Sequence, residues 1–422
     1  MSYNNGEWSV PRRMSENVGP PDAGYAILPS NDGLIGLFPV CDNNPGSRRT
    51  FNHRIEIHSF GCGEGCGEGL EDIEVTIPEK GFYILPFGIE SPAPDPPSEN
   101  DGLGLIWGDI HSHSFNSKCI CSINGSPEDM LRYQRDILGC SVLTLTDHTH
   151  HMGAQEFVWQ LDILEAFAGE NRIVLYSCEP GTRPGHHTNF YAFDRGVFER
   201  LRPIVLAYWD RDEMYSAIKE RLPKKSVLAL RHFHGFTQGP YGINGKKTAG
   251  TWDPDLEIAM EAMQVRGNIL LGEGESPAQF PANFLDAGAT IGLVGGSDHS
   301  TGKSPNHFCL TGFWVEERSA RGVWEALINR RTVACSNGKI SVWTDLEGLP
   351  MGSKASISGS VAIDVRLAAA RPIRRIGLMR DGEILEWVSV QSNSAQVTFT
   401  DVGPSRLSLV CRYRRGDFRV SE

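Results

Sequence analysis

The stretch Gly108-Asp109-Ile110-His111-Ser112-His113-Ser114 decides which fold the sequence predicts. It follows an apolar run, Leu103 to Trp107, that has the length and composition of a short buried strand. Side chains two residues apart on a strand project from the same face, so His111 and His113 point together beyond the carboxyl end of that strand. Neutral imidazole is the commonest metal ligand, and the pair therefore predicts half of a divalent-metal site. Taken alone, the two residues could equally be histidines that are exposed to solvent at a strand end and bind no metal.

The distribution of the other histidines favours the metal site. Eleven of the 13 lie between His111 and His307, and the other two are His53 and His58. Most of the eleven follow directly on an apolar run, and acidic residues share that position. The residues that end these strand-like runs are Asp147 and His148, Glu179, His232 and His234, and Asp298 and His299. Because the active sites of parallel α/β barrels lie at the carboxyl ends of the strands, this layout predicts such a barrel with a site for several metal ions.

Composition and charge limit the classes of function. The chain has 422 residues, of which 40% are hydrophobic, so it has room for two or three domains. No apolar run approaches the ~20 residues of a membrane helix, and residues 1–8 lack the basic start and apolar core of a signal peptide. These features predict a cytoplasmic protein with no membrane partner. Ten cysteines without a secretory signal are interpreted as thiols.

The formal net charge of −12 argues against nucleic acid as a partner, because binding to the phosphate backbone needs clustered Lys and Arg. A small anionic or ester substrate is compatible with that charge, since bound metal ions would reverse its local sign.

Three regions follow from the pattern of apolar residues. Residues 1–102 contain short alternating stretches among many Gly, Pro and Asn, which predicts an antiparallel β-rich region that ends in the Pro-rich segment 91–100. Residues 103–337 repeat strand, loop and helix, as βα units on a parallel sheet do. Residues 338–422 alternate with period two around the hairpin signal Asp381-Gly382. They predict a C-terminal β-sandwich with a structural role or a role in forming a homo-oligomer.

The clearest helix signal is Ser126-Pro127-Glu128-Asp129, which offers a Ser N-cap, Pro at the first position and acidic residues in the first turn, and Gly139 is expected to end the helix. Apolar spacing also predicts helices over residues 154–168, 212–222, 280–287 and 319–329. Residues 256–263 fit a helix and a strand equally well, because their apolar residues occur at both periods.

In this order the motifs resemble those of the PHP (polymerase and histidinol phosphatase) superfamily of metal-dependent phosphoesterases. The resemblance covers residues 103–355, and residues 327–352 look like the join between barrel and trailing β-sandwich in a PHP branch that includes uncharacterised bacterial proteins and relatives of carbaryl hydrolase. It implies a distorted (β/α)7 PHP-type barrel flanked by the two terminal β regions. The motifs that carry it are Gly108 to Ser114, Leu145-Thr146-Asp147-His148, Glu179, the His232 region and Gly296-Ser297-Asp298-His299.

The resemblance also implies a ligand set for two or three divalent ions. A first ion would be held by four ligands, Glu179 would bridge it to a second, and two further histidines would help to hold a third. The sets are His111, His113, Glu179 and Asp298 for the first ion, one of His186 and His187 with one of His232 and His234 for the second, and His148 with His299 for the third.

Two departures from the family pattern bear on the third ion. Relatives with three metals usually place another His a few residues after the first motif, where this chain has Asn116 and Lys118. Relatives also commonly separate the Asp and the His of the last motif by one residue, whereas Asp298 and His299 are adjacent.

The residue types themselves agree with a hydrolase. Mixed His and carboxylate ligands suit Zn, Mn or Fe. Two such ions ~3.5–4 Å apart lower the pKa of a bridging water and stabilise the attacking and leaving oxygens. The predicted function is hydrolysis of a small phosphate ester by that water. The catalytic candidates are Glu179 and Asp298, His150 as a proton donor to the leaving group, and Arg183 and Arg231 as partners of an anion.

Other interpretations stay open at this point. The same centre could cleave a carboxylic ester or a carbamate, and a metal barrel without catalysis could serve as a binding module. An amidohydrolase-type barrel also begins with His-x-His but typically bridges its metals with a carboxylated Lys at a strand end. Here the third strand-like run ends in Glu179, which favours the PHP-type interpretation.

Overall fold

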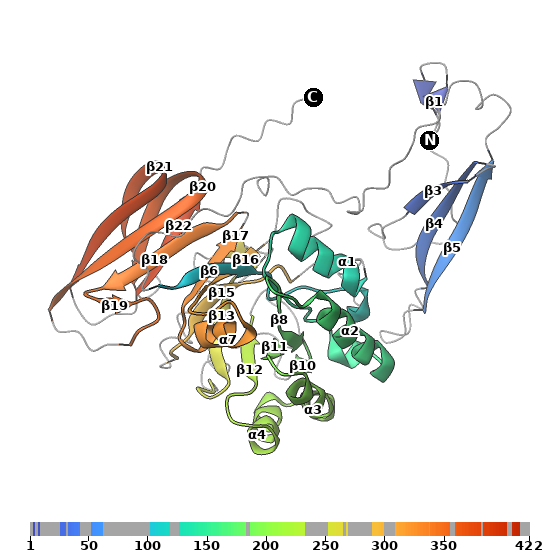
Figure 1. Cartoon of the computed structure of the whole chain (residues 1–422), viewed down its shortest axis with the longest axis horizontal. Coiled ribbons are helices and arrows are strands. Elements are labelled where there is room, and N and C mark those ends of the chain that lie inside the picture. The colour runs from blue at the N-terminus through green and yellow to red at the C-terminus, as the bar shows by residue number, and fades with distance from the viewer. Residues whose placement is uncertain are drawn as a thin grey trace. The chain divides into compact units, whose positions relative to one another are not determined.

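The structure of the chain is a computed structural model (Figure 1). It describes strands between residues 3 and 61, together with residues 102–118, 126–182, 186–232, 252–264, 267–268, 289–298, 309–336, 338–354, 359–380, 383–402 and 407–413. The chain divides into two compact units, Met1–Phe82 with Lys118–Asn124, and Tyr83–Ser117 with Gly125–Glu422. The domain boundaries expected after residues 102 and 337 stay predictions.

The first unit contains antiparallel strands, as the alternating N-terminal stretches predict. A short pair is formed by β1 (Tyr3–Asn4) and β2 (Glu7–Trp8). A three-stranded sheet follows in the order β3 (Ala26–Ser30), β4 (Gly33–Asp42) and β5 (Asn52–Gly61).

The second unit holds two sheets that carry the strand ends singled out in the sequence. Five strands form one sheet, in the order β17 (Thr332–Ser336), β16 (Cys309–Val315), β6 (Gly104–Gly108), β7 (Val142–Leu143) and β8 (Ile173–Val174). Seven form the other, in the order β10 (Gly181–Thr182), β11 (His186–Ala192), β12 (Leu228–Arg231), β13 (Glu257–Gln264) and β14 (Gly267–Asn268), with β9 (Tyr176–Cys178) beside β11 and β15 (Gly292–Gly295) beside β13.

The predicted (β/α)7 barrel is not evident in the described residues, which show a mixed α/β architecture. The parallel pairs are β6–β7, β7–β8, β12–β13 and β13–β15, whereas β11 runs antiparallel to both β9 and β12. Neighbouring parallel strands need a long crossover between them, usually a helix. The chain instead returns directly from β9 through β10 into β11, and this short return breaks the βα repeat.

Four of the five predicted helices form in the described residues, and α3 (Arg195–Ala207) forms where the sequence analysis predicts none. Ser126 caps α1 (Pro127–Arg132) in a capping box with Asp129, a π-helical turn η2 (Tyr133–Ile137) continues it, and Gly139 follows with a φ of +58°. Of the ambiguous residues 256–263, all but Leu256 belong to strand β13 (Glu257–Gln264), and the helix expected at 280–287 lies outside the described residues. The remaining helices are α2 (Ala154–Phe167), α3 (Arg195–Ala207), α4 (Arg211–Arg221) and α7 (Ala320–Ile328), with the 3-10 turns η1 (Phe115–Ser117) and η3 (Thr149–His151).

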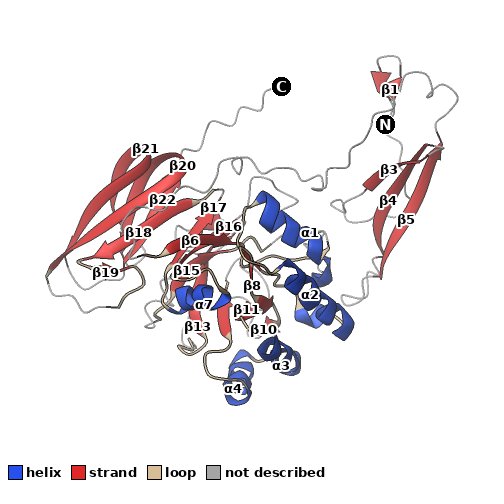
Figure 2. Cartoon of the chain, in the orientation of Figure 1, coloured by secondary structure: helices blue, strands red, loops and turns tan. Residues whose placement is uncertain are grey.

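The two sheets share one apolar interior. Ile106 and Val142 from the five-stranded sheet pack in the same buried cluster as Leu230 and Val294 from the seven-stranded sheet, and α7 adds Val323. Figure 2 shows helices α1, α2, α3 and α4 along the flank of these strands that faces away from the C-terminal sheet. This shared interior fixes the strand ends of both sheets relative to one another.

The described C-terminal strands pair into one antiparallel sheet, and the expected β-sandwich stays a prediction. The long strand β20 pairs with β18 along its first half, with β22 along its second half, and with β21 along most of its length. The turn residues Asp381 and Gly382 lie outside the described residues. The strands are β18 (Ile340–Leu346), β19 (Leu349–Pro350), β20 (Ser360–Arg380), β21 (Glu383–Val402) and β22 (Leu407–Tyr413).

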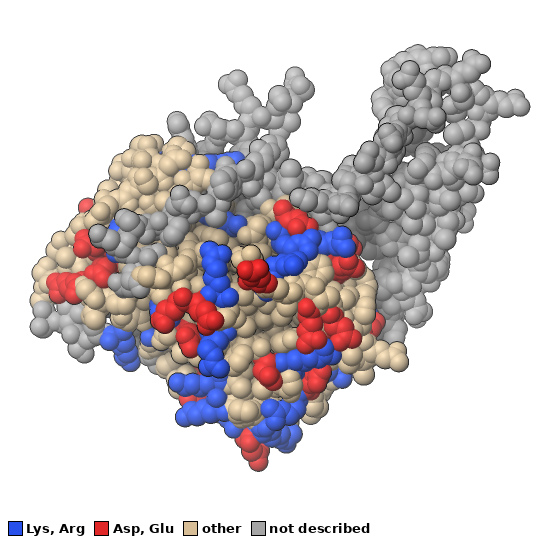
Figure 3. Space-filling view, in the orientation of Figure 1, with Lys and Arg blue, Asp and Glu red and all other residues tan. Residues whose placement is uncertain are grey.

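The surface of the second unit carries charges of both signs. On the face in Figure 3, Lys and Arg side chains lie interspersed with Asp and Glu rather than in a field of one sign. The guanidinium of Arg195 on α3, for example, contacts Asp162, Glu165 and Glu199. Among the described residues, none of the helices combines the length and the apolar character that crossing a membrane requires.

Trp314 on β16 joins the five-stranded sheet to the C-terminal sheet. Its fully buried indole donates a hydrogen bond to the carbonyl of Val342 at 2.9 Å and lies 5.1 Å from the ring of Trp343. We expect Trp314→Ala to lower the free energy of unfolding by about 3–5 kcal/mol, because it leaves a cavity and an unpaired carbonyl. Chemical denaturation measures this. Trp209→Ala, which alters a half-exposed indole, is the control. An equal loss of stability in the two variants would contradict the prediction.

Candidate metal centre

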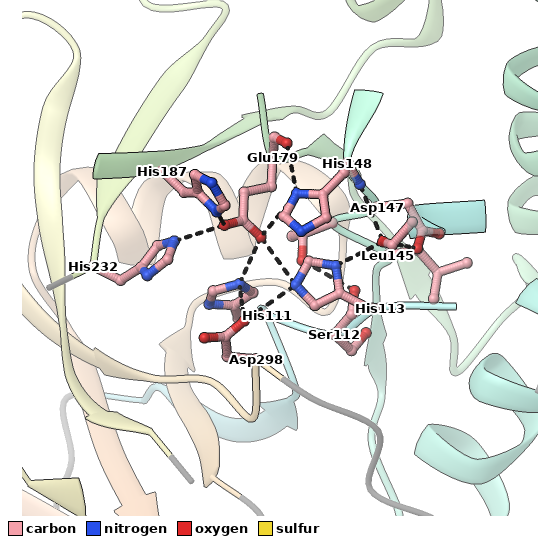
Figure 4. Close-up of polar contacts among 12 residues, drawn as sticks. His111, Ser112, His113, Leu145, Asp147, His148, Glu179, His187, His232 and Asp298 are labelled. Atoms are coloured by element: carbon pink, nitrogen blue, oxygen red, sulfur yellow. Dashed lines mark hydrogen bonds and ion pairs between the residues drawn. The ribbon is translucent and has the colours of Figure 1, made fainter. Parts of the chain in front are cut away.

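The strand ends bring a buried group of histidines and carboxylates together (Figure 4). His111 and His113 follow β6, Glu179 follows β9, His232 follows β12 and Asp298 follows β15. His187 comes from the beginning of β11. Because β11 runs antiparallel to β9 and β12, its first residues lie at the same edge as their last ones.

Glu179 lies at the middle of the group, and its two oxygens face different histidines. Its Oε2 is 3.1 Å from Nε2 of His111 and 2.9 Å from Nε2 of His113. Its Oε1 is 2.5 Å from Nδ1 of His187 and 3.0 Å from Nε2 of His232. The carboxylate therefore separates the imidazoles into two sets, as a carboxylate that bridges two ions would.

Asp298 completes the first of these sets. Its Oδ1 lies 3.2 Å from Nε2 of both His111 and His113. Its backbone has a φ of +58°, which is uncommon for a residue with a side chain. The N–H of Asp298 donates to the carbonyl of His111 at 2.7 Å, so the conformation is held by the chain segment that carries the first two histidines.

His148 lies beside both sets. Its ring centroid is 4.8 Å from that of His113 and 4.9 Å from that of His187, and its Nδ1 is 3.9 Å from Oε2 of Glu179. His150 lies further out, 5.4 Å from the ring of His148, and burial lowers its pKa to about 4. A ring with that pKa is neutral at pH 7, and the role of His150 as a proton donor to the leaving group stays a prediction.

The electrostatics of the group show paired charges of opposite sign. Burial alone would raise the pKa of Glu179, yet the surrounding histidines hold it well below its usual range. Burial alone would lower the pKa of His113, yet Glu179 and Asp298 raise it to about 9. The pKa of His111 is likewise raised, against the effect of burial, by the carboxylates of Glu261, Asp298 and Glu179. The buried carboxylate of Glu179 thus stays ionised, and cationic groups beside it balance its charge.

The donor set fits divalent ions. Buried charges in proteins are paired or coordinate metals, and imidazole with carboxylate is a mixture that transition metals accept. Three overlapping groups each bring their ligand atoms within 4.8 Å of one another. They are His111, His113, Glu179 and Asp298; His111, His232 and Glu261; and His148, Glu179 and His187.

His113 is supported from behind by a hydroxyl and a carboxylate. Its Nδ1 is 2.9 Å from Oγ of Ser117, and that hydroxyl donates to Oδ1 of Asp147 at 2.6 Å. Ser114 donates to the same carboxylate through both its N–H and its hydroxyl, at 2.7 Å each. Asp147, part of the second sequence motif, therefore supports a histidine through Ser117.

Asp109 ties two of the strand ends together. Its fully buried Oδ1 accepts from the N–H of His111 at 3.2 Å and from the N–H of Ser297 at 3.0 Å. Burial raises the pKa of Asp109 to about 6. The residue thus connects the segment after β6 with the segment after β15.

Glu261 and Gln264 on β13 are functional candidates that the sequence analysis missed. Both are buried, and they lie behind His111 and Asp298. Polar residues within an otherwise apolar, buried strand would have indicated a functional site. Because residues 256–263 fit a helix and a strand equally well, the sequence did not show that these two residues lie on such a strand.

Arg231 does not face the centre. It is 1% exposed, and its Nε donates to Oε1 of Glu257 at 2.5 Å, in a network that Tyr215 joins from α4. Neighbouring residues on a strand point to opposite faces, so with His232 directed at Glu179 the guanidinium points away. The expectation that Arg231 binds an anionic substrate is corrected accordingly.

Several predicted site residues lie where the structure gives no side-chain description. The backbone of His186 belongs to β11, but its side chain falls outside the described residues, so the choice between His186 and His187 stays open although His187 contacts Glu179. Arg183, His234 and His299 also lie outside the described residues.

Comparisons with known proteins give only distant structural likenesses. No family model and no curated protein matches the chain. A two-domain protein from Bacteroides vulgatus that contains a predicted PHP-like metal-dependent phosphoesterase is 14% identical, with a TM-score of 0.42 over 75% of this chain and 89% of that one. The lesion-specific endonuclease PfuEndoQ from Pyrococcus furiosus is 14% identical, with a TM-score of 0.37 over 53% and 56%. An endonuclease Q bound to a 27-mer duplex with an abasic lesion is 13% identical, with a TM-score of 0.35 over the same shares. At such scores we take nothing about this chain's chemistry from the likeness.

The expectation that nucleic acid is not a partner is withdrawn, because two of these neighbours are endonuclease structures and the charge argument behind the expectation does not hold. The prediction rested on the net charge of the whole chain, which does not describe the field at any one site. Charges of both signs are interspersed on the surface in Figure 3, and metal ions at a centre would change the local sign.

Ser117 offers a test of the support behind His113. We expect Ser117→Ala to weaken zinc binding about 10–100-fold, because Nδ1 of His113 loses its partner, and outer partners of ligating histidines typically have effects of that size. A competition titration against a chromophoric chelator measures it. Ser216→Ala, on the exposed side of α4, should bind zinc as the wild type does. Equal zinc affinities for all three proteins would refute the role of Ser117.

Proposed function

We propose that this chain is a metal-dependent hydrolase that cleaves a small phosphate ester. The observation that carries the proposal is the position of Glu179, whose two oxygens each face a separate pair of imidazoles in a buried site. Bridging carboxylates of this kind are suited to hold a pair of divalent ions. The resemblance of the sequence motifs to PHP phosphoesterases supports the same conclusion.

The ligands divide into two sets around Glu179. His111, His113 and Asp298 would hold one ion with Oε2 of Glu179, and His187 and His232 would hold a second with Oε1. His148 is placed to assist a third or to complete the second set. Zn, Mn and Fe all suit these donors. When bound, such ions would act as Lewis acids, lower the pKa of water and neutralise charge that develops on a phosphoryl group.

The chain's own residues would orient the ligands and exclude water from behind them. Asp109 and the backbone of His111 fix the segment that carries Asp298, while Ser117 and Asp147 fix the ring of His113. A constellation held from several elements keeps its geometry during turnover, which is a condition for efficient catalysis.

A carboxylic ester or a carbamate is the second candidate substrate class, and one observation bears on it. Arg231 is paired with Glu257, so it does not provide the positive charge that favoured an anion at the sequence level. The test must therefore offer both kinds of ester.

We expect Glu179→Gln to lose both metal and activity. The change keeps the shape but removes the charge that both ligand sets share, so turnover should fall by more than the ~10–100-fold typical of outer partners. Elemental analysis of the purified protein and turnover of p-nitrophenyl phosphate and p-nitrophenyl acetate measure the two effects. Glu199→Gln, at an exposed ion pair with Arg195, is the control.

The outcomes separate the candidates. About two transition-metal equivalents per chain, with phosphate turnover lost in Glu179→Gln, would support the proposal. Turnover of the acetate ester alone would replace the phosphate substrate with the carboxylic ester. Bound metal without turnover of any ester would leave a metal-binding module, and less than one equivalent after reconstitution would refute the centre itself.

A further inference from the structure

Glu261 is a buried carboxylate behind the metal centre that none of the sequence motifs contains. It belongs to β13 and is fully buried. Its Oε1 lies 2.9 Å from Nδ1 of His111, while Nε2 of the same ring lies 3.1 Å from Oε2 of Glu179. Because an ionised carboxylate only accepts hydrogen bonds, the proton of this contact belongs to Nδ1. With an ion in the centre, His111 would be neutral and the lone pair of its ring would be on Nε2, which faces the centre.

Gln264, three residues further along the same strand, ties Glu261 to Asp298. Its amide nitrogen donates to Oε2 of Glu261 at 3.0 Å and to Oδ2 of Asp298 at 2.5 Å. An amide NH₂ group carries two protons, so both bonds can exist together. One side chain thereby connects the carboxylate behind His111 with the carboxylate that shares its ion.

The backbone next to Asp298 is shaped around this arrangement. A Cβ atom on Gly296 would lie 2.4 Å from Oε1 of Glu261 and 2.4 Å from Cβ of His111. Non-bonded contacts of a Cβ atom are essentially never this short, so glycine lets the strand end approach both groups. Glu261, Gln264 and Gly296 thus form a fitted layer on the side of the ligands away from Glu179.

We infer that Glu261 and Gln264 are positioning residues of the metal centre, with Glu261 fixing the tautomer and orientation of His111 and Gln264 holding Asp298 against it. The inference rests on the proposed centre. Metal-ligating histidines commonly donate their second N–H to a carboxylate, which orients the ring and makes it a stronger ligand. His113 instead has the hydroxyl of Ser117 in that position, so the two histidines of the first motif are supported by groups of different charge.

The same strand provides a matched control. Glu257 is a buried carboxylate on β13 like Glu261, but it pairs with Arg231 and Tyr215 instead of a histidine. Glu257→Gln and Glu261→Gln therefore make the same change at the same depth with different partners. If Glu257→Gln does not fold, Tyr215→Phe takes its place as the control, because it removes only one hydrogen bond to Glu257.

The experiment measures zinc binding to the full chain without any substrate. We expect Glu261→Gln and Gln264→Met to bind the wild-type number of zinc ions with about 10–100-fold weaker affinity. Glu257→Gln should bind zinc with wild-type affinity and melt at a lower temperature. In ¹⁵N-histidine-labelled, zinc-loaded protein, the Nδ1–H proton of His111 should resonate far downfield, and this signal should move upfield in Glu261→Gln but not in Glu257→Gln.

Several results would overturn the inference. Unchanged zinc affinity in Glu261→Gln and Gln264→Met would show that the layer does not position the ligands. Loss of a whole zinc equivalent in Glu261→Gln would make Glu261 a direct ligand with His111 and His232. Failure of the wild type to bind zinc would refute the proposed centre, whereas zinc binding without ester turnover would refute the hydrolase alone and leave this inference standing.

Discussion

The fold of the second unit must satisfy one constraint. The buried carboxylate of Glu179 needs cationic groups, or groups that can bind a metal cation, on all sides. A carboxylate without such partners would be protonated in the interior. His111, His113, His187 and His232 contact it from three different strand ends. The loops after β6, β9 and β12 and the start of β11 must therefore meet at one edge, and the shared apolar interior of the two sheets holds them there.

The antiparallel strand β11 also contributes a residue to this edge. In a uniform parallel barrel every ligand would follow the end of a strand. Here β11 enters from the opposite direction and supplies His187 from its first residues, paired in register with Gly181 just beyond Glu179. The direct return through β10 keeps these two candidate ligands close in sequence as well as in space. A short hairpin can thus replace a βα unit and still deliver a ligand to the same place.

The sequence predicted which candidate ligands lie at strand ends better than it predicted the architecture, for a physical reason. An apolar run followed by His, Asp or Glu is a local pattern, and it located His111, His113, Glu179, His232 and Asp298 correctly at strand ends. The direction of β11, the burial of Arg231 against Glu257 and the contact of Glu261 with His111 depend on which strands become neighbours. Residues 150 positions apart, as in the last case, leave no mark on local periodicity. Helix α1 was predictable because its capping box lies within four consecutive residues.

The position of Arg231 changes the account of how an anionic substrate would be bound. Its charge is neutralised by Glu257, while Glu179, Asp298 and Glu261 place negative charge around the centre. Those carboxylates would repel a substrate phosphate unless the positive charge of the bound ions exceeded the negative charge of the carboxylates. Two divalent ions exceed the three carboxylates by about one unit of charge at an otherwise acidic site. Among the described residues, the ions rather than the side chain of Arg231 would then attract the substrate, which is why the net charge of the chain is a poor guide to its partners.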